Sequence, residues 1–255
     1  MLKEASAAAE RRNGEKGTPQ VDFFQLPDVT NDFELLIVLY RVGSVVLDGR
    51  TAAPCRSEGS RRCQENLLAW HKKYRNAPAF RRQEANLMIL WHAVFMSLHM
   101  DFDTLERFCG REGPEATERN RAAAEKWATS EEAKVCIIHA VLVQRHCESI
   151  PIGTQPPMHF PPCLYRCGIA WYCYTSFADK PTSHSMADLD LTGLEILEIN
   201  TVRANLEEAG LTDGRPVASP LFKITSLLQR GGQWTIGHSL ASTLLALLEH
   251  DSAPV

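Results

Sequence analysis

Long uninterrupted apolar runs are missing from this 255-residue sequence. No segment reaches the roughly 18 apolar residues that a membrane-spanning helix needs, and the first residues lack the apolar core of a secretory signal. A strong charge of one sign is also missing, because 27 Lys and Arg stand against 31 Asp and Glu, a net charge of −4. Nucleic-acid-binding modules are usually strongly basic. We therefore expect a soluble, intracellular protein that is not, as a whole, a nucleic-acid-binding module.

Cysteine pairs with zinc-binding spacing are absent too, although eight cysteines are present. No two stand as Cys-x-x-Cys, and Cys163, Cys167 and Cys173 fit neither a two-Cys two-His finger nor a six-cysteine binuclear cluster. Without a secretion signal, cysteines are normally reduced. We expect these thiols to pack as small apolar residues.

One helical segment does gather potential metal ligands, namely Cys136, His139, His146 and Cys147. On a helix they share one arc, but Cys136 and Cys147 lie about 16 Å apart along its axis. All ligands of a zinc ion must reach within about 2.3 Å of it, so these four cannot serve one ion. Cys136 with His139 could supply two ligands if other segments supplied the rest, whereas core packing explains both without a metal. We predict no metal site in this chain.

Catalytic signatures are missing as well. The sequence has no nucleophile elbow of the form Gly-x-Ser-x-Gly, no phosphate loop, no Gly-x-Gly-x-x-Gly and no His-Glu-x-x-His. Asp188 and Asp190 lie close together in a polar segment, where solvated carboxylates are the simpler interpretation. His92 and His99 are expected to be partly buried, hydrogen-bonded helix residues. The sequence thus names no catalytic or cofactor-binding residue, and an enzyme would need a constellation that it does not reveal.

Helical spacing of apolar residues is what the sequence does have. It predicts an irregular all-α bundle of about eight or nine helices, with residues 1–20 as a disordered lead-in and 21–255 as one domain. The clearest helix covers 84–100, with an apolar stripe on one face. The other helices are expected to begin at 31 or 32 and at 161, and to cover 61–74, 104–108, 129–147, 191–209, 219–230 and 234–250.

Local side-chain patterns refine this expectation. Phe33, Leu36, Ile37 and Tyr40 share one face of the first helix, which Asn31 or Asp32 caps. A capping box predicts Thr129 as the N-cap of the 129–147 helix. The large apolar residues predicted to form the structural core are Trp91, Leu98, Trp127, Trp171, Trp234, Leu240 and Leu244.

Charge is unevenly distributed along the chain. Residues 61–82 contain seven Lys or Arg and one Glu, and residues 183–214 contain seven Asp or Glu and one Arg. A basic segment can meet phosphate or an acidic partner. No nucleic-acid-reading motif accompanies it, so solvated faces or mutual neutralisation within the fold are the simpler interpretations.

Three short stretches of the sequence are informative when they are taken together and in order. They are Leu90-Trp91-His92 with Leu98-His99-Met100-Asp101 and 105–113, then Trp127-Ala128-Thr129-Ser130, then Trp234-Thr235-Ile236-Gly237 with Leu240, Ala241, Leu244 and Leu247. Together they resemble the fungal-specific transcription factor domain, or middle homology region. The third is similar to the terminal helix of fungal two-Cys two-His finger activators. The resemblance covers about residues 65–255.

The resemblance implies a non-enzymatic regulatory domain in the nucleus, which contacts transcription machinery, co-regulator proteins or a small effector, and no membrane. DNA binding and zinc are implied only for the family's fingers, which this chain lacks, so no cofactor is expected here. The chain would then be a fragment, a truncated product or a finger-less paralogue. The alternative is a free-standing all-α ligand-binding or adaptor protein without transcriptional activity. Zinc fingers encoded upstream in frame would favour the first interpretation.

Overall fold

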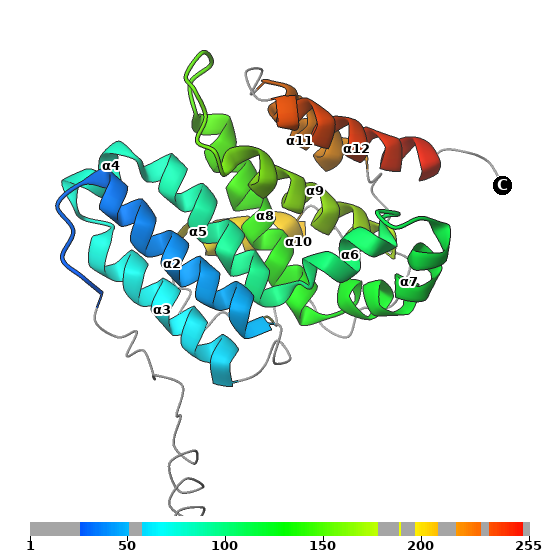
Figure 1. Ribbon diagram of the computed structural model, residues 1–255, viewed down its shortest axis with the longest axis horizontal. Coiled ribbons are helices and arrows are strands. Elements are labelled where there is room, and N and C mark those ends of the chain that lie inside the picture. Colours follow the sequence, from blue (N-terminus) through cyan, green and yellow to red (C-terminus); the bar gives the residue numbers. More distant parts are fainter. Residues whose placement is uncertain are drawn as a thin grey trace, which may run out of the picture.

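The computed structural model describes residues 26–50, 58–177, 189, 197–208, 218–230 and 235–251. All regular secondary structure in these residues is helical, which confirms the all-α prediction (Figure 1). The described part contains eleven helices, so the expected count of eight or nine was too low. Their bounds are α2 Asp32–Arg50, α3 Glu58–Tyr74, α4 Pro78–Arg82, α5 Glu84–His99, α6 Phe102–Phe108, α7 Pro114–Ala128, α8 Glu131–Ser149, α9 Phe160–Thr175, α10 Leu197–Glu208, α11 Ala218–Arg230 and α12 Thr235–Asp251.

The two helices missed by the sequence analysis are α4 and α7. Helix α4 has only five residues and begins with Pro78 in its first turn, so it is too short to show a helical period. Helix α7 is polar over most of its surface, and its buried residues are Ala116, Ala124 and Ala128. Three alanines do not form the stripe of large apolar residues by which amphipathic helices are recognised.

Helix α5 is the centre of the bundle. Every residue from Leu87 to Leu98 is buried, not only the stripe predicted from the sequence. The reason is that α5 packs against α2, α3, α8 and α9, so no face of this segment remains for solvent. A helix that is apolar on all sides suits this position.

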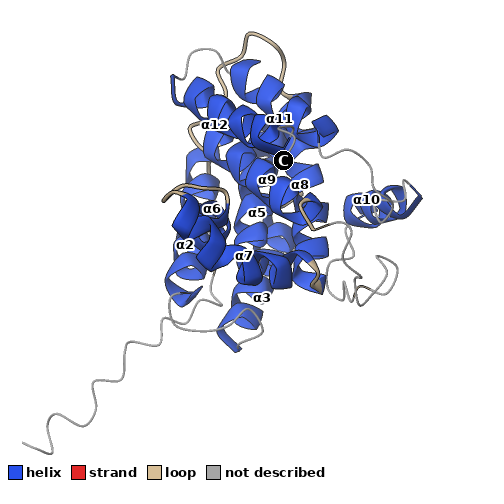
Figure 2. Cartoon of the chain, turned by 90° about the vertical axis from the view of Figure 1, so that its right-hand side faces the viewer, coloured by secondary structure: helices blue, strands red, loops and turns tan. Residues whose placement is uncertain are grey.

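The remaining helices pack around this centre in pairs. Helices α11 and α12 pair with each other and cover α9, and α6 pairs with α7 next to α9 (Figure 1). Helix α10 packs against α8 and lies at the edge of the bundle (Figure 2). None of the described helices combines the length and the apolar character that crossing a bilayer requires.

Two helix starts test the capping predictions. Asn31 caps α2, since its side-chain oxygen accepts the Glu34 backbone N–H at 3.0 Å, which decides between the two candidates. The cap of α8 is Ser130, whose hydroxyl accepts the Ala133 backbone N–H at 3.2 Å. The prediction of Thr129 was wrong by one position, because Thr129 follows the end of α7 and its hydroxyl donates to the Glu125 carbonyl.

Most of the predicted apolar face of α2 is directed to solvent, and only Leu36 of that face is half-buried and packs against the core. Phe33, Ile37 and Tyr40 are 70%, 48% and 43% exposed. The buried face is the neighbouring row that contains Leu35 and Leu39, both fully buried. Both rows are apolar in this sequence, so the period alone could not show which row faces the core.

Candidate functional site

Two histidines form a buried hydrogen bond between α5 and α8. His92 on α5 and His139 on α8 are both fully buried, and their Nδ1 atoms lie 2.8 Å apart. One Nδ1 must therefore donate a proton and the other must accept it. Burial lowers the pKa of both side chains well below the usual value of a histidine, because an imidazolium would lose its hydration there. Both rings are thus neutral at neutral pH.

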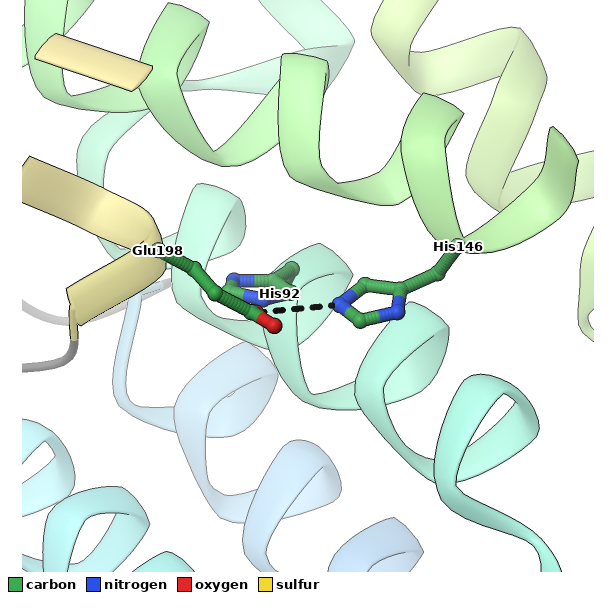
Figure 3. A group of neighbouring side chains, drawn as sticks. All are labelled: His92, His146 and Glu198. Atoms are coloured by element: carbon green, nitrogen blue, oxygen red, sulfur yellow. Dashed lines mark ion pairs between the residues drawn. The ribbon is translucent and has the colours of Figure 1, made fainter. Parts of the chain in front are cut away.

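A third histidine and a carboxylate lie beside this pair. The His146 ring stacks on the His92 ring, with centroids 5.5 Å apart and planes 20° apart. His146 Nε2 lies 3.6 Å from a carboxylate oxygen of Glu198, which α10 contributes (Figure 3). The neighbouring His146 side chain lowers the pKa of the Glu198 carboxyl, so this group is an anion. One ligand atom each from His92, His146 and Glu198 lies within 4.8 Å of the other two.

A fourth histidine approaches from α3. His71 is half-buried and interacts electrostatically with both His92 and Glu198. Burial is the main cause that lowers the pKa of His71, followed by the nearby Arg75 cation. Four helices therefore direct imidazole or carboxylate groups at one place, which we call the histidine cluster: His71, His92, His139, His146 and Glu198.

The sequence contained part of the signal for this cluster. His139 and His146 are seven residues apart, a spacing that keeps both on one side of α8. His139 and His146 are potential ligands already in the sequence, where they stand in one set with the cysteines of the same helix. Glu198 was missed, because nothing in the local sequence indicates that α10 lies against α8.

The cysteines of that earlier set lie in the core. Cys136 is fully buried with its Sγ 3.4 Å from the Met100 sulfur, and Cys147 is also fully buried. None of the seven described cysteines forms a disulfide, and six of them are buried. Apolar packing is therefore confirmed for these six. The structure does not bring Cys136 and His139 together with further ligands in the described residues.

The predicted core residues occupy three kinds of position. Trp91, Leu98, Trp171 and Leu244 are buried. Trp127 and Leu240 are half-buried and pack against the core. Trp234 lies outside the described residues.

A small pocket lies on the other side of α5. Its volume is about 280 Å³, and α2, α5 and α9 line it with mainly apolar side chains. The polar groups at its wall include Tyr40, His159 and Arg166. The Arg166 guanidinium lies 5.1 Å from the centre of the Phe102 ring and contacts the Ser97 hydroxyl at 3.4 Å. A cation and two neutral polar groups in an apolar pocket suit a small ligand with a negative group.

Comparison of the chain with protein-family models, curated proteins and solved structures finds no match. The assignment of a function therefore depends on the residues described above and on the resemblance of the three stretches.

Proposed function

We propose that this chain is a non-enzymatic regulatory domain of a fungal transcription factor. The observation that carries the proposal is a hydrogen bond between two of the three resembling stretches. The Trp127 indole N–H donates to the His99 carbonyl at 2.7 Å, directly before the junction at which Asp101 caps α6. The tryptophan of the second stretch thus holds the Leu-His-x-Asp junction of the first stretch in place. A scaffold role of this kind is what the physical character of these residues predicts.

The other resembling residues also support the scaffold. Arg107 pairs with Asp103 at 2.6 Å within α6, and with Glu112 at 2.9 Å across the turn that follows α6. That turn contains Gly110 and Gly113 with φ of 93° and 89°, a backbone conformation that favours glycine. In the third stretch, Leu244 of α12 is fully buried. The side chains that carry the resemblance hold turns and helices together.

A regulatory domain needs contacts with other molecules. The pocket between α2, α5 and α9 is where we place a small effector, since it is apolar and has the Arg166 cation at its wall. Co-regulator proteins are the proposed macromolecular partners, the nucleus is the proposed location, and DNA would be reached through a finger module outside this chain.

A tethering experiment tests the proposal. The 255-residue chain is fused to a heterologous DNA-binding domain and expressed in a fungal host with a reporter gene. We expect the fusion to change reporter output relative to the DNA-binding domain alone. The Trp127→Ala variant, which removes the junction bond, should lose the effect, and Ile152→Ala, at an 83% exposed position, should keep it. Equal reporter output from the fusion and the bare DNA-binding domain, at equal protein levels, would contradict the proposal.

The alternative is a ligand-binding protein without transcriptional activity, and the same pocket favours it. The two functions differ in the tethering experiment. A free-standing ligand-binding protein would leave the reporter unchanged, whereas a regulatory domain changes it.

A further inference from the structure

We propose that His92, His146 and Glu198 form a binding site for one zinc ion, which fastens α10 to α5 and α8. The three side chains come from three helices that are distant in sequence (Figure 3). The proposal replaces the expectation, drawn from the sequence, that the chain has no metal site.

The geometry is close to that of a zinc site. Zinc lies about 2.0–2.1 Å from imidazole nitrogens and carboxylate oxygens in tetrahedral sites. Neighbouring ligand atoms are then about 3.3 Å apart, as follows from the tetrahedral angle. The 3.6 Å between His146 Nε2 and the Glu198 oxygen is close to this value. All three ligand atoms lie within 4.8 Å of one another, and the Glu198 side chain is 53% exposed, so it is free to adjust its position.

An unsatisfied atom supports the site independently. His92 is fully buried, and its Nε2 has no hydrogen-bond partner in the described part of the chain. A buried polar atom without a partner costs about 1–3 kcal/mol, which a bound metal ion would offset. A zinc ion at this position would be coordinated by the imidazoles of His92 and His146 and by the carboxylate of Glu198.

The hydrogen bond with His139 can orient His92 as a metal ligand. If His92 Nδ1–H donates to His139 Nδ1, the lone pair of His92 is left on Nε2. Histidines that bind metals commonly donate their other ring N–H in this way, which fixes the tautomer and the orientation of the ring. The buried 2.8 Å contact therefore supplies the outer-shell partner that a metal ligand needs.

The ligand types select among metals. Magnesium and calcium prefer oxygen ligands, whereas two imidazoles with one carboxylate suit zinc and neighbouring transition metals. Three protein ligands leave one tetrahedral position, which a water molecule could occupy. Helix α10 packs against α8 in the described residues, so an ion bound by Glu198 adds a link from α10 to α5.

Zinc titration by isothermal calorimetry tests the site. The full chain, freed of metal with a chelator, should bind one zinc ion. Glu198→Gln should weaken binding by more than about tenfold, the lower bound found when even outer-shell partners are removed. Glu207→Gln, at an exposed position of the same helix, is the matched control and should bind as the wild type does. Circular dichroism of both variants verifies that the helices are retained. Absence of saturable binding, or equal affinity of wild type and Glu198→Gln, would overturn the proposal.

Cobalt(II) distinguishes these ligands from the cysteines. A four-coordinate cobalt ion bound by nitrogen and oxygen should give visible d–d absorption without a thiolate-to-cobalt band in the near ultraviolet. His146→Gln should remove the visible band, and His238→Gln, on an exposed position of α12, should leave it. A thiolate band would place the metal on cysteines and would also overturn the proposal.

Hydrogen exchange tests the fastening of α10. Zinc should slow amide exchange in residues 197–208 of the wild type, because bound metal stabilises the state that binds it. The same residues of Glu198→Gln should show no slowing. Exchange in α10 that does not respond to zinc in the wild type would refute the link between α10 and the core.

Discussion

His159 shows how one side chain connects three helices. Its Nε2 lies 2.9 Å from the Asn86 carbonyl and must carry the proton, since a carbonyl only accepts. Its Nδ1 lies 3.1 Å from the Tyr40 hydroxyl, which donates to the neutral ring. Burial lowers the pKa of His159, and the bond to Asn86 opposes this shift. A buried, neutral histidine therefore joins α2, α5 and the start of α9.

This arrangement predicts an acid-sensitive contribution to stability. An unfolded histidine has a pKa of about 6.5, and that of folded His159 is lower. Between the two values the unfolded chain binds more protons, so the free energy of unfolding falls as the pH drops below about 6.5. Urea unfolding at pH 7.5 and 5.5 measures this loss. His159→Gln, which keeps a donor for Asn86, should lose less stability over this range than the wild type; an equal loss would contradict the assignment.

The buried cysteines predict selective alkylation. Burial raises the pKa of Cys163 to about 12 and that of Cys167 well above its usual value. Alkylation requires the thiolate, so iodoacetamide at pH 8 should leave both unmodified in the folded chain and modify both in guanidinium. Cys109 is half-buried and should react first among the described cysteines. Peptide mass spectrometry gives the extent at each position, and fast native labelling of Cys163 would argue against its burial.

Helix α12 illustrates how an element is positioned by close contacts. Its Leu244 lies over Gly168 of α9, where an added Cβ would come within 2.5 Å of a Leu244 methyl. Its Gly237 lies beside α11, where an added Cβ would come within 2.9 Å of the Leu228 carbonyl oxygen. Two glycines thus let α12 approach both neighbours.

Truncation of this contact should destabilise the fold. Leu240→Ala with Leu244→Ala should lower the melting temperature, with most of the loss from Leu244, because it is fully buried and Leu240 only partly. Leu to Ala in a packed core costs about 2–5 kcal/mol. A thermal melt measures the effect, and Ile236→Ala, at a 54% exposed position, is the control. A wild-type melting curve for the double variant would mean that this face serves a partner instead of the core.

The helices also show which parts of the fold could be predicted from the sequence. Large apolar residues at helical spacing predicted α5, α8 and α12, because burial of a stripe leaves a period in the sequence. The buried face of α7 consists of alanines and leaves no such period. Helix α2 has two apolar rows, so its sequence could not show which of the two is buried. The histidine cluster required contacts between α5, α8 and α10, and these depend on packing between segments up to about a hundred residues apart, which no local pattern encodes.

At the scale of the whole molecule, charge governs contacts with nucleic acid. The net charge is −4, and part of the basic segment is neutralised within the fold, since Arg61 pairs with Glu65, Lys73 with Asp28 and Arg82 with Asp32. These three pairs do not show mutual neutralisation of the basic and acidic segments, which was one of the interpretations open at the sequence level. Glu65 lies on the same helix as Arg61, Asp28 lies just before α2, and Asp32 is the first residue of α2, so none of the three partners comes from the acidic segment.

The chain alone should therefore bind duplex DNA weakly. Non-specific binding is typically in the range of about 10⁻⁴–10⁻⁶ M at physiological salt and weakens steeply as salt increases. Fluorescence anisotropy with unrelated duplexes should show equal, salt-sensitive affinities in or above this range. Nanomolar, sequence-selective binding by this chain would show that it contains its own DNA-reading element.

The complete burial of α5 has a consequence for mutational tolerance. In a saturation-mutagenesis library, an amphipathic helix such as α11 should tolerate polar substitutions in a rhythm, at exposed Phe222, Lys223 and Ser226 but not at buried Leu221 and Ile224. From Leu87 to Leu98 that rhythm disappears, because each position in this segment faces a neighbouring helix. All twelve positions of this segment should therefore be intolerant of polar substitutions. Mutagenesis alone would then identify α5 as the central helix of the bundle.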